Sequence, residues 1–301
     1  MSEGSSTYAG AFSRLSDFGS PPQGSPPQTR LEPAEARRYL EEGLEGVGRH
    51  QYYNPQKLCT AINREIKEFQ FHGPAQYAVF SPVTDEEFTK IDKVRSRSHK
   101  GLRFLFLTNE RTLVVKFMVG VAHKIALETF AELFMLKYSS MGLRRELVCL
   151  GGACFSSLAS QKEADRAYKP KSRKYLTDLP TIVFECGVSE SLKRLMVDAK
   201  WWLENSGERW ELLSLLLFQW RKGVCMRRRG NWRTWLIRRM ATRTGGCKIV
   251  GETVTGAPLK ISFKKTMLRD PDEGLGEDDI VFDAEDFKEV AETVWAALEW
   301  T

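Results

Sequence analysis

Two acidic residues and a lysine in the middle of the chain have the types and spacing needed for phosphate chemistry. Glu185 interrupts the run PTIVFEC, which otherwise has the pattern of a buried strand. A buried carboxylate stays ionised only where a cation, a metal or several hydrogen-bond donors replace the lost water. Asp165 precedes this strand, and Asp198 and Lys200 follow it on a predicted helix. Glu185 is therefore a candidate metal ligand.

These residue types match the requirements of phosphodiester hydrolysis. A hard divalent cation neutralises phosphate oxygens and lowers the pKa of an attacking water, and carboxylates are suitable ligands for Mg²⁺. We therefore expect Asp165 and Glu185 to hold Mg²⁺ or Mn²⁺. A second cation near the same point can orient the water and stabilise the charge of the transition state.

Lys200 is the predicted second cation. At about 100° per residue, the apolar residues of the helix over residues 191–205 gather on one side, with Lys200 on one flank and Asp198 on the other. A flank lysine can lay its methylene groups over apolar surface and carry its ammonium toward the strand end. Trp201 then projects away from the core side, either as a surface contact or beneath the C-terminal segment.

Apolar periodicity and turn residues predict the elements that position these side chains. The predicted order is a long buried helix, three strands, a second helix and a fourth strand, which defines an α/β fold. The helices cover residues 119–138 and 191–205. The strands cover residues 146–150, 153–158, 180–185 and 212–218.

Composition and pattern divide the 301 residues into five predicted segments. Residues 1–32 are rich in Ser, Gly and Pro and cannot bury enough side chain to offset the entropy of ordering, so we expect a disordered tail. The other four segments are an N-terminal accessory region of helices and strands at 33–117, a core at 118–220, a basic arm rich in Trp and Arg at 221–248, and a C-terminal strand, acidic loop and helix packing on the core at 249–301.

The element order, with an Asp ahead of a strand that ends in Glu, resembles the PD-(D/E)XK nuclease superfamily, which has the restriction-endonuclease-like fold. The likeness is to members in which the active-site lysine has moved from the Glu strand to the next helix. The sequence also resembles a group of fungal proteins that share an aspartate, a strand ending in Glu-x-Gly-x-Ser-x-Ser and a helix containing Asp-Ala-x-Trp-Trp. Those elements read here KEAD at 162–165, ECGVSES at 185–191 and DAKWWL at 198–203.

The resemblance implies a restriction-endonuclease-like core at 118–220 and a metal-dependent endonuclease activity, with Asp165, Glu185 and Lys200 as catalytic residues. The sequence departs from the usual pattern at one point, because Gly187 stands where the lysine two residues after the Glu is expected. This departure supports an alternative: a catalytically inactive protein of the same fold that binds partners or acts as a scaffold through its basic arm.

The basic arm is the predicted nucleic-acid contact. Residues 220–248 contain no acid, and many arginines stand among three tryptophans. Arginine and tryptophan together can contact phosphates and stack on bases. We expect contacts with DNA or RNA from four of the arginines: Arg227, Arg228, Arg229 and Arg233. A solvated surface arm and a nuclear localisation signal are alternatives for the same residues.

Other charged groups leave further alternatives open. The acidic stretch at 270–286 could fold against the basic arm and mask it, and a protein-interaction role without nucleic acid is a third function. On the first long helix, His123, Glu128 and Glu132 are candidates for an additional site residue, although a lone helical His is more often structural. Ser189 and Ser191 are most simply helix caps.

The bulk properties favour an intracellular protein of the nucleus or cytoplasm. The formal net charge of +6 permits a polyanionic partner without requiring one. The six cysteines contain no Cys-x-x-Cys pair, so we expect free thiols and no structural zinc. The N-terminal residues lack the apolar core of a signal peptide, and no apolar run approaches the roughly 20 residues needed to span a bilayer.

Overall fold

The computed structural model describes most of the chain beyond residue 32. The described ranges are 33–72, 76–98, 101–117, 121–175, 177–187, 192–205, 214–221, 234–239, 246–250 and 253–299. The predicted disordered tail at 1–32, the two serine caps and the four arginines of the predicted nucleic-acid contact lie outside the described residues.

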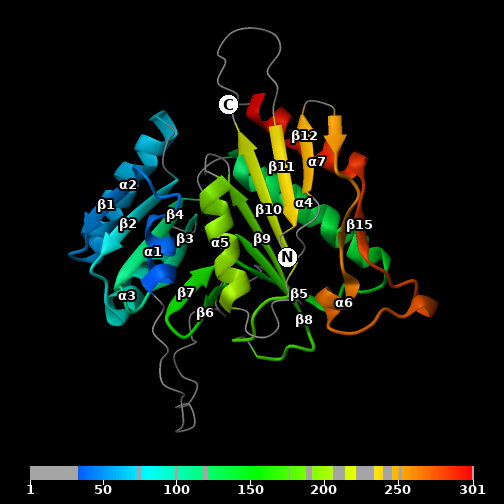
Figure 1. Cartoon of the computed structure of the whole chain (residues 1–301), viewed down its shortest axis with the longest axis horizontal. Coiled ribbons are helices and arrows are strands. Elements are labelled where there is room, and N and C mark those ends of the chain that lie inside the picture. Colours follow the sequence, from blue (N-terminus) through cyan, green and yellow to red (C-terminus); the bar gives the residue numbers. More distant parts are fainter. Residues whose placement is uncertain are drawn as a thin grey trace, which may run out of the picture.

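Two β-sheets lie on either side of a central helical layer (Figure 1). The N-terminal sheet contains, in spatial order, β1 (Gly48–Gln51), β2 (Tyr77–Ser81), β4 (Thr112–Phe117), β3 (Leu102–Leu107), β7 (Ser160–Glu163) and β6 (Cys154–Ser156). The second sheet contains β13 (Thr253–Thr255), β12 (Gly246–Val250), β11 (Thr234–Arg239), β10 (Ser214–Arg221), β9 (Ile182–Gly187), β8 (Arg166–Pro170) and β5 (Leu147–Gly151). The second sheet is mixed, because β9 and β10 are parallel and its other pairs are antiparallel.

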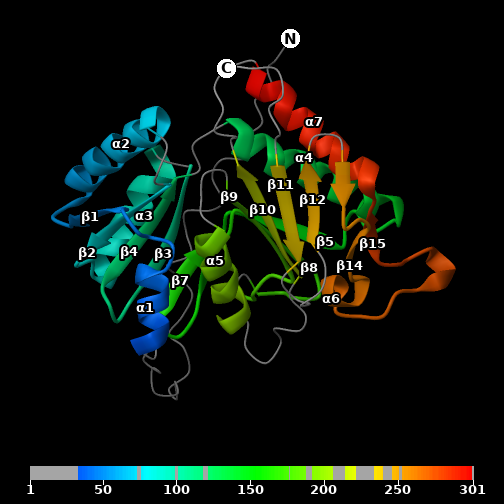
Figure 2. The ribbon, with the colours of Figure 1, turned by 45° about the horizontal axis from the view of Figure 1, so that its top comes forward.

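Helices form the central layer and cover both outer faces (Figure 2). The central layer contains α1 (Pro33–Glu41) and α5 (Leu192–Asn205), and the outer face of the N-terminal sheet carries α2 (Pro55–His72) and α3 (Asp85–Ser98). The outer face of the second sheet carries α4 (Val121–Ser140) and α7 (Ala284–Glu299). Beside them lie α6 (Phe263–Met267), a 3₁₀ turn (Glu273–Leu275) and the strand pair β14 (Leu259–Ile261) and β15 (Ile280–Phe282). Within the described part of the chain, no helix has the length and hydropathy needed to cross a membrane.

Three hydrophobic cores lie between these layers. The first outer core, beneath α2 and α3, includes Phe104, Val115 and Phe117. The central core contains the buried face of α5 together with side chains from both sheets, among them Leu105, Val114, Ala167, Val183 and Trp202. The second outer core, beneath α4 and α7, includes Phe130, Phe184 and Cys186. Because side chains alternate along a strand, each sheet presents one face to the central core.

The predicted α/β fold and its element order are confirmed. The series helix, three strands, helix, strand is present as α4, β5, β8, β9, α5 and β10. The identity of the second strand was wrong: the predicted strand at 153–158 belongs to the hairpin of β6 and β7, which pairs with β3 in the N-terminal sheet. Its place in the series is taken by β8, in a segment too polar to show a strand pattern.

The predicted segment boundaries at 117 and 220 do not separate the two sheets. The hairpin of β6 and β7 follows the first boundary in sequence yet extends the N-terminal sheet. Likewise β11 and β12 fall in the predicted basic arm yet extend the second sheet next to β10. The N-terminal sheet therefore takes two strands from beyond residue 117, and the region at 33–117 is continuous with the core.

The turn after α1 packs closely against α5 and provides a test of this layer. Gly43 and Gly46 both have positive φ angles, of 71° and 74°. A Cβ added to Gly43 would lie 2.6 Å from Cβ of Arg194, whereas one added to Gly46 would meet nothing within 4 Å. We expect Gly46→Ala to lower the free energy of unfolding by about 1 kcal/mol through backbone strain, and Gly43→Ala by about 2 kcal/mol more through overpacking.

Urea unfolding of the two glycine variants measures this difference. Gly46→Ala is the matched control, because it carries the same backbone strain in the same turn without the steric overlap. Equal losses of stability in the two variants would contradict the close contact between this turn and α5.

Candidate active site

Asp165 and Glu185 meet at the face of the second sheet that borders the central core. In β9 the side chains of Phe184 and Cys186 belong to the second outer core, so strand alternation turns Glu185 to the central face. Asp165 directly precedes β8, the strand that pairs with β9. Its Oδ2 accepts a hydrogen bond of 2.7 Å from the backbone N–H of Cys186. The two carboxylates predicted from the sequence therefore lie together.

A lysine from the N-terminal sheet joins the two carboxylates. Lys116 Nζ lies 3.0 Å from Asp165 Oδ2 and 3.4 Å from Glu185 Oε2. Alternation along β4 places Val115 and Phe117 in the first outer core and turns Lys116 to the central layer. The side chain of Lys116 is 4% exposed and the carboxylates are 0% exposed. One buried ammonium therefore bridges both acids across the two sheets.

A second lysine from the N-terminal sheet contacts the other oxygen of Glu185. Glu185 Oε1 accepts a 2.7 Å hydrogen bond from Trp202 Nε1 and lies 3.5 Å from Lys162 Nζ. Lys162 is the cross-strand partner of Leu105, whose side chain belongs to the central core, so both side chains face α5. Both oxygens of Glu185 thus contact donors.

Asp198 on α5 extends the cluster toward α1. Its Oδ1 lies 3.4 Å from Lys162 Nζ and 3.2 Å from Arg194 Nη2, and its Oδ2 accepts a 2.9 Å hydrogen bond from Tyr77 Oη. Arg194 also donates to the backbone carbonyl of Tyr39 in α1 at 2.7 Å. Side chains of both sheets and of α5, together with the backbone of α1, are thereby connected through one set of charges and hydrogen bonds.

The cluster is balanced in formal charge. It contains three carboxylates and three basic side chains, all of them buried: Asp165, Glu185 and Asp198 with Lys116, Lys162 and Arg194. Ions removed from water are stable only when opposite charges and hydrogen bonds compensate for the lost hydration. Each acid here has at least one basic partner, which explains how ionised groups are tolerated between the sheets.

The environment gives the three acids different proton affinities. Burial raises the pKa of Glu185, and nearby Lys162 only partly opposes this effect. Burial also acts to raise the pKa of Asp165, but Lys116 and His123 outweigh it and hold the pKa well below its usual range. For Asp198 burial is outweighed by Lys162 and Arg194, which lower the pKa to about 2. The two aspartates are therefore ionised at neutral pH.

The surroundings of Asp165 fit a divalent cation. Its Oδ1 is buried and has no hydrogen-bond partner among the described residues, and an unpaired buried carboxylate oxygen is costly unless a ligand satisfies it. No cluster of three or more His, Cys, Asp or Glu ligands occurs in the part of the chain that the structure describes. A divalent ion at Asp165 and Glu185 would therefore have to take its remaining ligands from water and phosphate, as Mg²⁺ commonly does.

His123 is the candidate on the first long helix that reaches the cluster. It lies near the beginning of α4, with Nε2 3.6 Å from Asp165 Oδ2. Burial lowers its pKa despite the neighbouring Asp165, which favours the neutral imidazole. The rival candidates lie elsewhere: Glu128 is 2.5 Å from Arg166 and half exposed, and Glu132 is exposed.

Lys200 is not brought to the two carboxylates. Its side chain is 49% exposed, and its Nζ lies 3.5 Å from Glu204 Oε1 in the next turn of α5. Asp198 and Trp202 face the cluster, and a residue two positions from each lies about 200° around the helix. The basic groups that contact the carboxylates come instead from the N-terminal sheet.

The expected orientation of Trp201 was also wrong. Trp201 is fully buried, and its Nε1 donates a 2.8 Å hydrogen bond to Ser160 Oγ in β7. A helix with an apolar side and an exposed side was assumed, but α5 lies between two sheets. Both tryptophans are therefore covered, Trp201 bonding to the N-terminal sheet and Trp202 to Glu185.

Lys116 and Lys162 are the site residues that the sequence reasoning missed. Lys116 stands alone in the apolar run TLVVKF, which is the same signal that identified Glu185 in PTIVFEC. A lone charge in a buried strand requires a partner of opposite charge, and two such strands could have been matched to each other. Lys162 gave no comparable signal, because its neighbours in QKEADRAYKP are polar.

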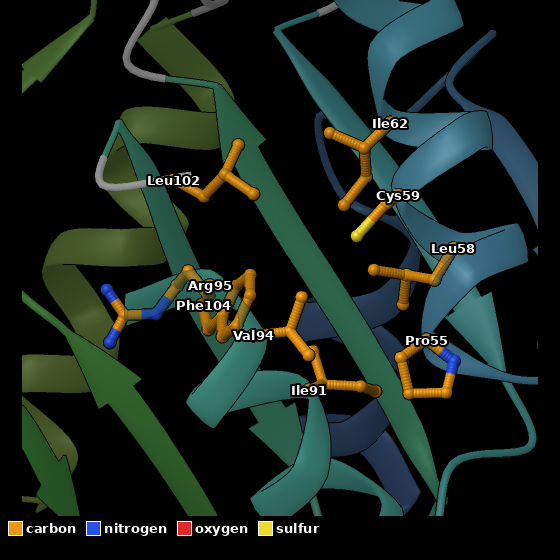
Figure 3. Close-up of a pocket in the computed structure, with 9 residues that line it drawn as sticks. All are labelled: Pro55, Leu58, Cys59, Ile62, Ile91, Val94, Arg95, Leu102 and Phe104. Carbon is orange, nitrogen blue, oxygen red and sulfur yellow. The ribbon is translucent and has the colours of Figure 1, made fainter. Parts of the chain in front are cut away.

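A separate apolar pocket lies in the N-terminal layer between α2, α3 and β3 (Figure 3). It has no acidic lining residue, and Arg95, its one charged residue, makes a 2.7 Å ion pair with Glu163. This pocket therefore lacks the ligands for a metal-dependent reaction. The full lining is Pro55, Leu58, Cys59, Ile62, Ile91, Val94, Arg95, Leu102 and Phe104.

Comparison with known proteins gives one kind of match. No protein-family model matches the sequence, and no curated protein matches it. Two chains among the solved structures match. One of them is a protein of Anabaena variabilis ATCC 29413 described as a "putative nuclease belonging to DUF820", with 11% sequence identity and a TM-score of 0.41. The match covers 71% of this chain and 99% of that chain.

The charge cluster makes a prediction about stability and pH. We expect Asp198→Asn to lower the free energy of unfolding at neutral pH by about 3 kcal/mol, because Lys162 and Arg194 lose their buried counter-charge. The lowered pKa of Asp198 contributes stability above the unfolded value of about 3.8, and this contribution disappears as the pH falls toward about 2. Between pH 3.8 and pH 2 the free energy of unfolding of the native protein should thus fall by about 2 kcal/mol through Asp198 alone.

Urea unfolding between pH 2 and pH 7 measures both effects. In Asp198→Asn the free energy of unfolding should fall less steeply as the pH is lowered, because the contribution of Asp198 is missing. Asp270→Asn is the control, because Asp270 is 76% exposed and its ion pair with Lys264 is on the surface; it should behave as the native protein. An unchanged acid-side slope in Asp198→Asn would contradict the assigned contacts.

Proposed function

We propose that this chain is a nuclease-like protein that hydrolyses phosphodiester bonds of DNA or RNA, with Mg²⁺ or Mn²⁺ held by Asp165 and Glu185. The observation that carries the proposal is the meeting of these two carboxylates, distant in sequence, at the ammonium of Lys116. Two acids and a basic group at one point are the side chains that metal-assisted phosphodiester hydrolysis requires.

The side chains divide the proposed work among them. Asp165 offers Oδ1, which is buried and lacks a hydrogen-bond partner among the described residues, and Glu185 offers Oε2. Trp202 fixes the orientation of Glu185 through its other oxygen. A bound divalent ion would supply charge neutralisation at the phosphate and a lower pKa for the attacking water. His123 lies beside the same carboxylate, with Nε2 3.6 Å from Asp165 Oδ2.

Replacement of Glu185 tests the proposed activity. We expect Glu185→Gln to reduce cleavage of single- and double-stranded DNA or RNA by at least about 100-fold, because the neutral amide is a weaker ligand for the divalent ion than the charged carboxylate. The measurement is product formation on gels with Mg²⁺ or Mn²⁺. Glu132→Gln on the exposed face of α4 is the matched control and should cleave as the native protein. Cleavage that survives in Glu185→Gln rejects the assignment.

A second candidate function is nucleic-acid binding without catalysis on the same fold. It is supported by the formal charge balance of the cluster, in which three buried acids already have three basic partners. Gly187 in place of the usual lysine supports the same alternative. Titration with Mn²⁺ separates the two functions. A catalytic site should bind Mn²⁺ in a way that Asp165→Asn abolishes, whereas an inactive protein should show no such binding.

The arginines of the basic arm give both candidate functions a common test. We expect the variant with Arg227, Arg228, Arg229 and Arg233 all changed to Gln to bind DNA more weakly, with the slope of log affinity against log salt reduced by up to about 4. Filter binding over a range of salt concentrations measures this slope. The control changes four exposed basic residues elsewhere by the same charge: Arg144, Arg145, Lys171 and Lys174. A native protein that retains neither DNA nor RNA would instead favour a protein-interaction role.

A further inference from the structure

We infer that the N-terminal sheet supplies the catalytic ammonium of this site: Lys116 of β4 takes the role that Gly187 leaves vacant, and it competes with the divalent ion for the carboxylates of Asp165 and Glu185. The inference rests on the proposed function. It assigns a catalytic role to a residue outside the sequence segment that resembles the nuclease core.

The strand that carries Glu185 cannot provide this ammonium itself. Gly187, two residues further along β9, is on the same face as Glu185 but has no side chain. Lys200 is on the opposite side of α5 and pairs with Glu204. An ammonium at the two carboxylates must therefore come from another element, and β4 provides one in Lys116.

Of the two lysines from the N-terminal sheet, Lys116 is better placed for a direct role. Lys116 Nζ lies within 3.4 Å of an oxygen from each carboxylate. Lys162 instead lies between Glu185 Oε1 and Asp198, and it contacts the Glu185 oxygen that also accepts the Trp202 hydrogen bond. Lys162 is thus a positioning residue that contacts Oε1 of Glu185. Lys116 contacts Oε2, the oxygen that the proposed function offers to the metal.

The positions of the contacts imply competition between Lys116 and a bound metal. Asp165 Oδ2 and Glu185 Oε2 are the oxygens that the ammonium contacts. A divalent ion on Asp165 Oδ1 and Glu185 Oε2 would share Glu185 Oε2 with this ammonium, and the two positive charges would repel each other strongly in a site shielded from water. The Lys116 contacts and metal binding therefore oppose one another. Removing the ammonium should strengthen metal binding while it removes a group that stabilises the transition state.

This combination of opposite effects identifies a catalytic role. A variant that merely damaged the fold would weaken metal binding and cleavage together. A Lys116 variant should instead have a lower melting temperature without metal, because two buried carboxylates lose a shared partner. Mn²⁺ should then raise its melting temperature more than that of the native protein, because binding restores the missing positive charge.

The experiment compares Lys116→Met with Lys200→Met in the full chain. For Lys116→Met we expect Mn²⁺ affinity, measured by calorimetry with Mn²⁺ alone, to rise at least about 10-fold, and cleavage to fall at least about 100-fold. Lys200→Met removes an exposed lysine and should match the native protein in melting temperature, Mn²⁺ affinity and cleavage. If Lys116→Met does not fold, Lys116→Gln, which keeps a neutral donor, replaces it with the same expectations.

The possible results separate this inference from the proposed function. Unchanged or weaker Mn²⁺ binding by the Lys116 variants overturns the inference, whether or not the native protein cleaves. Native cleavage that Glu185→Gln abolishes but Lys116→Met preserves overturns it as well, and leaves the proposed function standing. A native protein without cleavage rejects the proposed function together with the catalytic role of Lys116, whereas tighter Mn²⁺ binding by Lys116→Met would still support competition between Lys116 and the metal at these two carboxylates.

Discussion

The compensation of buried charge is the constraint on which this structure depends. Glu185 and Asp165 belong to the second sheet and are shielded from water, and the lysines that compensate them belong to the N-terminal sheet. Removing one partner of a buried ion pair typically costs about 3 to 5 kcal/mol. Separation of the two sheets would therefore leave these carboxylates and lysines without partners in an apolar layer, unless water entered it. The two sheets are held together by charge as well as by the central core.

Helix α5 can serve both sheets because it carries different groups on successive faces. Trp201 bonds to Ser160 of the N-terminal sheet, and Trp202 bonds to Glu185 of the second sheet. Asp198 lies one helical turn before Trp202 and forms ion pairs with Lys162 and Arg194. Because a strand and a helix each fix the direction of a side chain, the position of Glu185 is defined from three elements at once. Such support is what a precise arrangement of ligands requires.

The sequence predicted the elements better than their partners. The periods of apolar residues located α4, α5 and β9, because these elements bury apolar side chains, and the apolar run at 212–218 located β10. The same signal failed for β7 and β8, whose buried side chains include Lys162, Glu163 and Lys169. The meeting of Asp165 and Glu185 was expected from their chemistry and from the superfamily resemblance, because β8, the strand that brings Asp165 beside β9, showed no strand pattern in the sequence. The position of Lys116 depended on how the two sheets face each other, which no local pattern in either segment specifies.

Lys116, and not the predicted Lys200, contacts the two carboxylates. Both proposed functions, catalysis and binding without catalysis, are compatible with this contact. A lysine on α5 would have stood beside the carboxylates and left their oxygens free, whereas Lys116 contacts those oxygens directly. In that position the same ammonium stabilises the fold without metal and would oppose the divalent ion of the proposed reaction. The affinity for a divalent ion would then be the difference between the interaction of the carboxylates with the ion and their interaction with Lys116. The unpaired Oδ1 of Asp165 favours the metal in this balance, because Lys116 and the backbone of Cys186 both contact Oδ2.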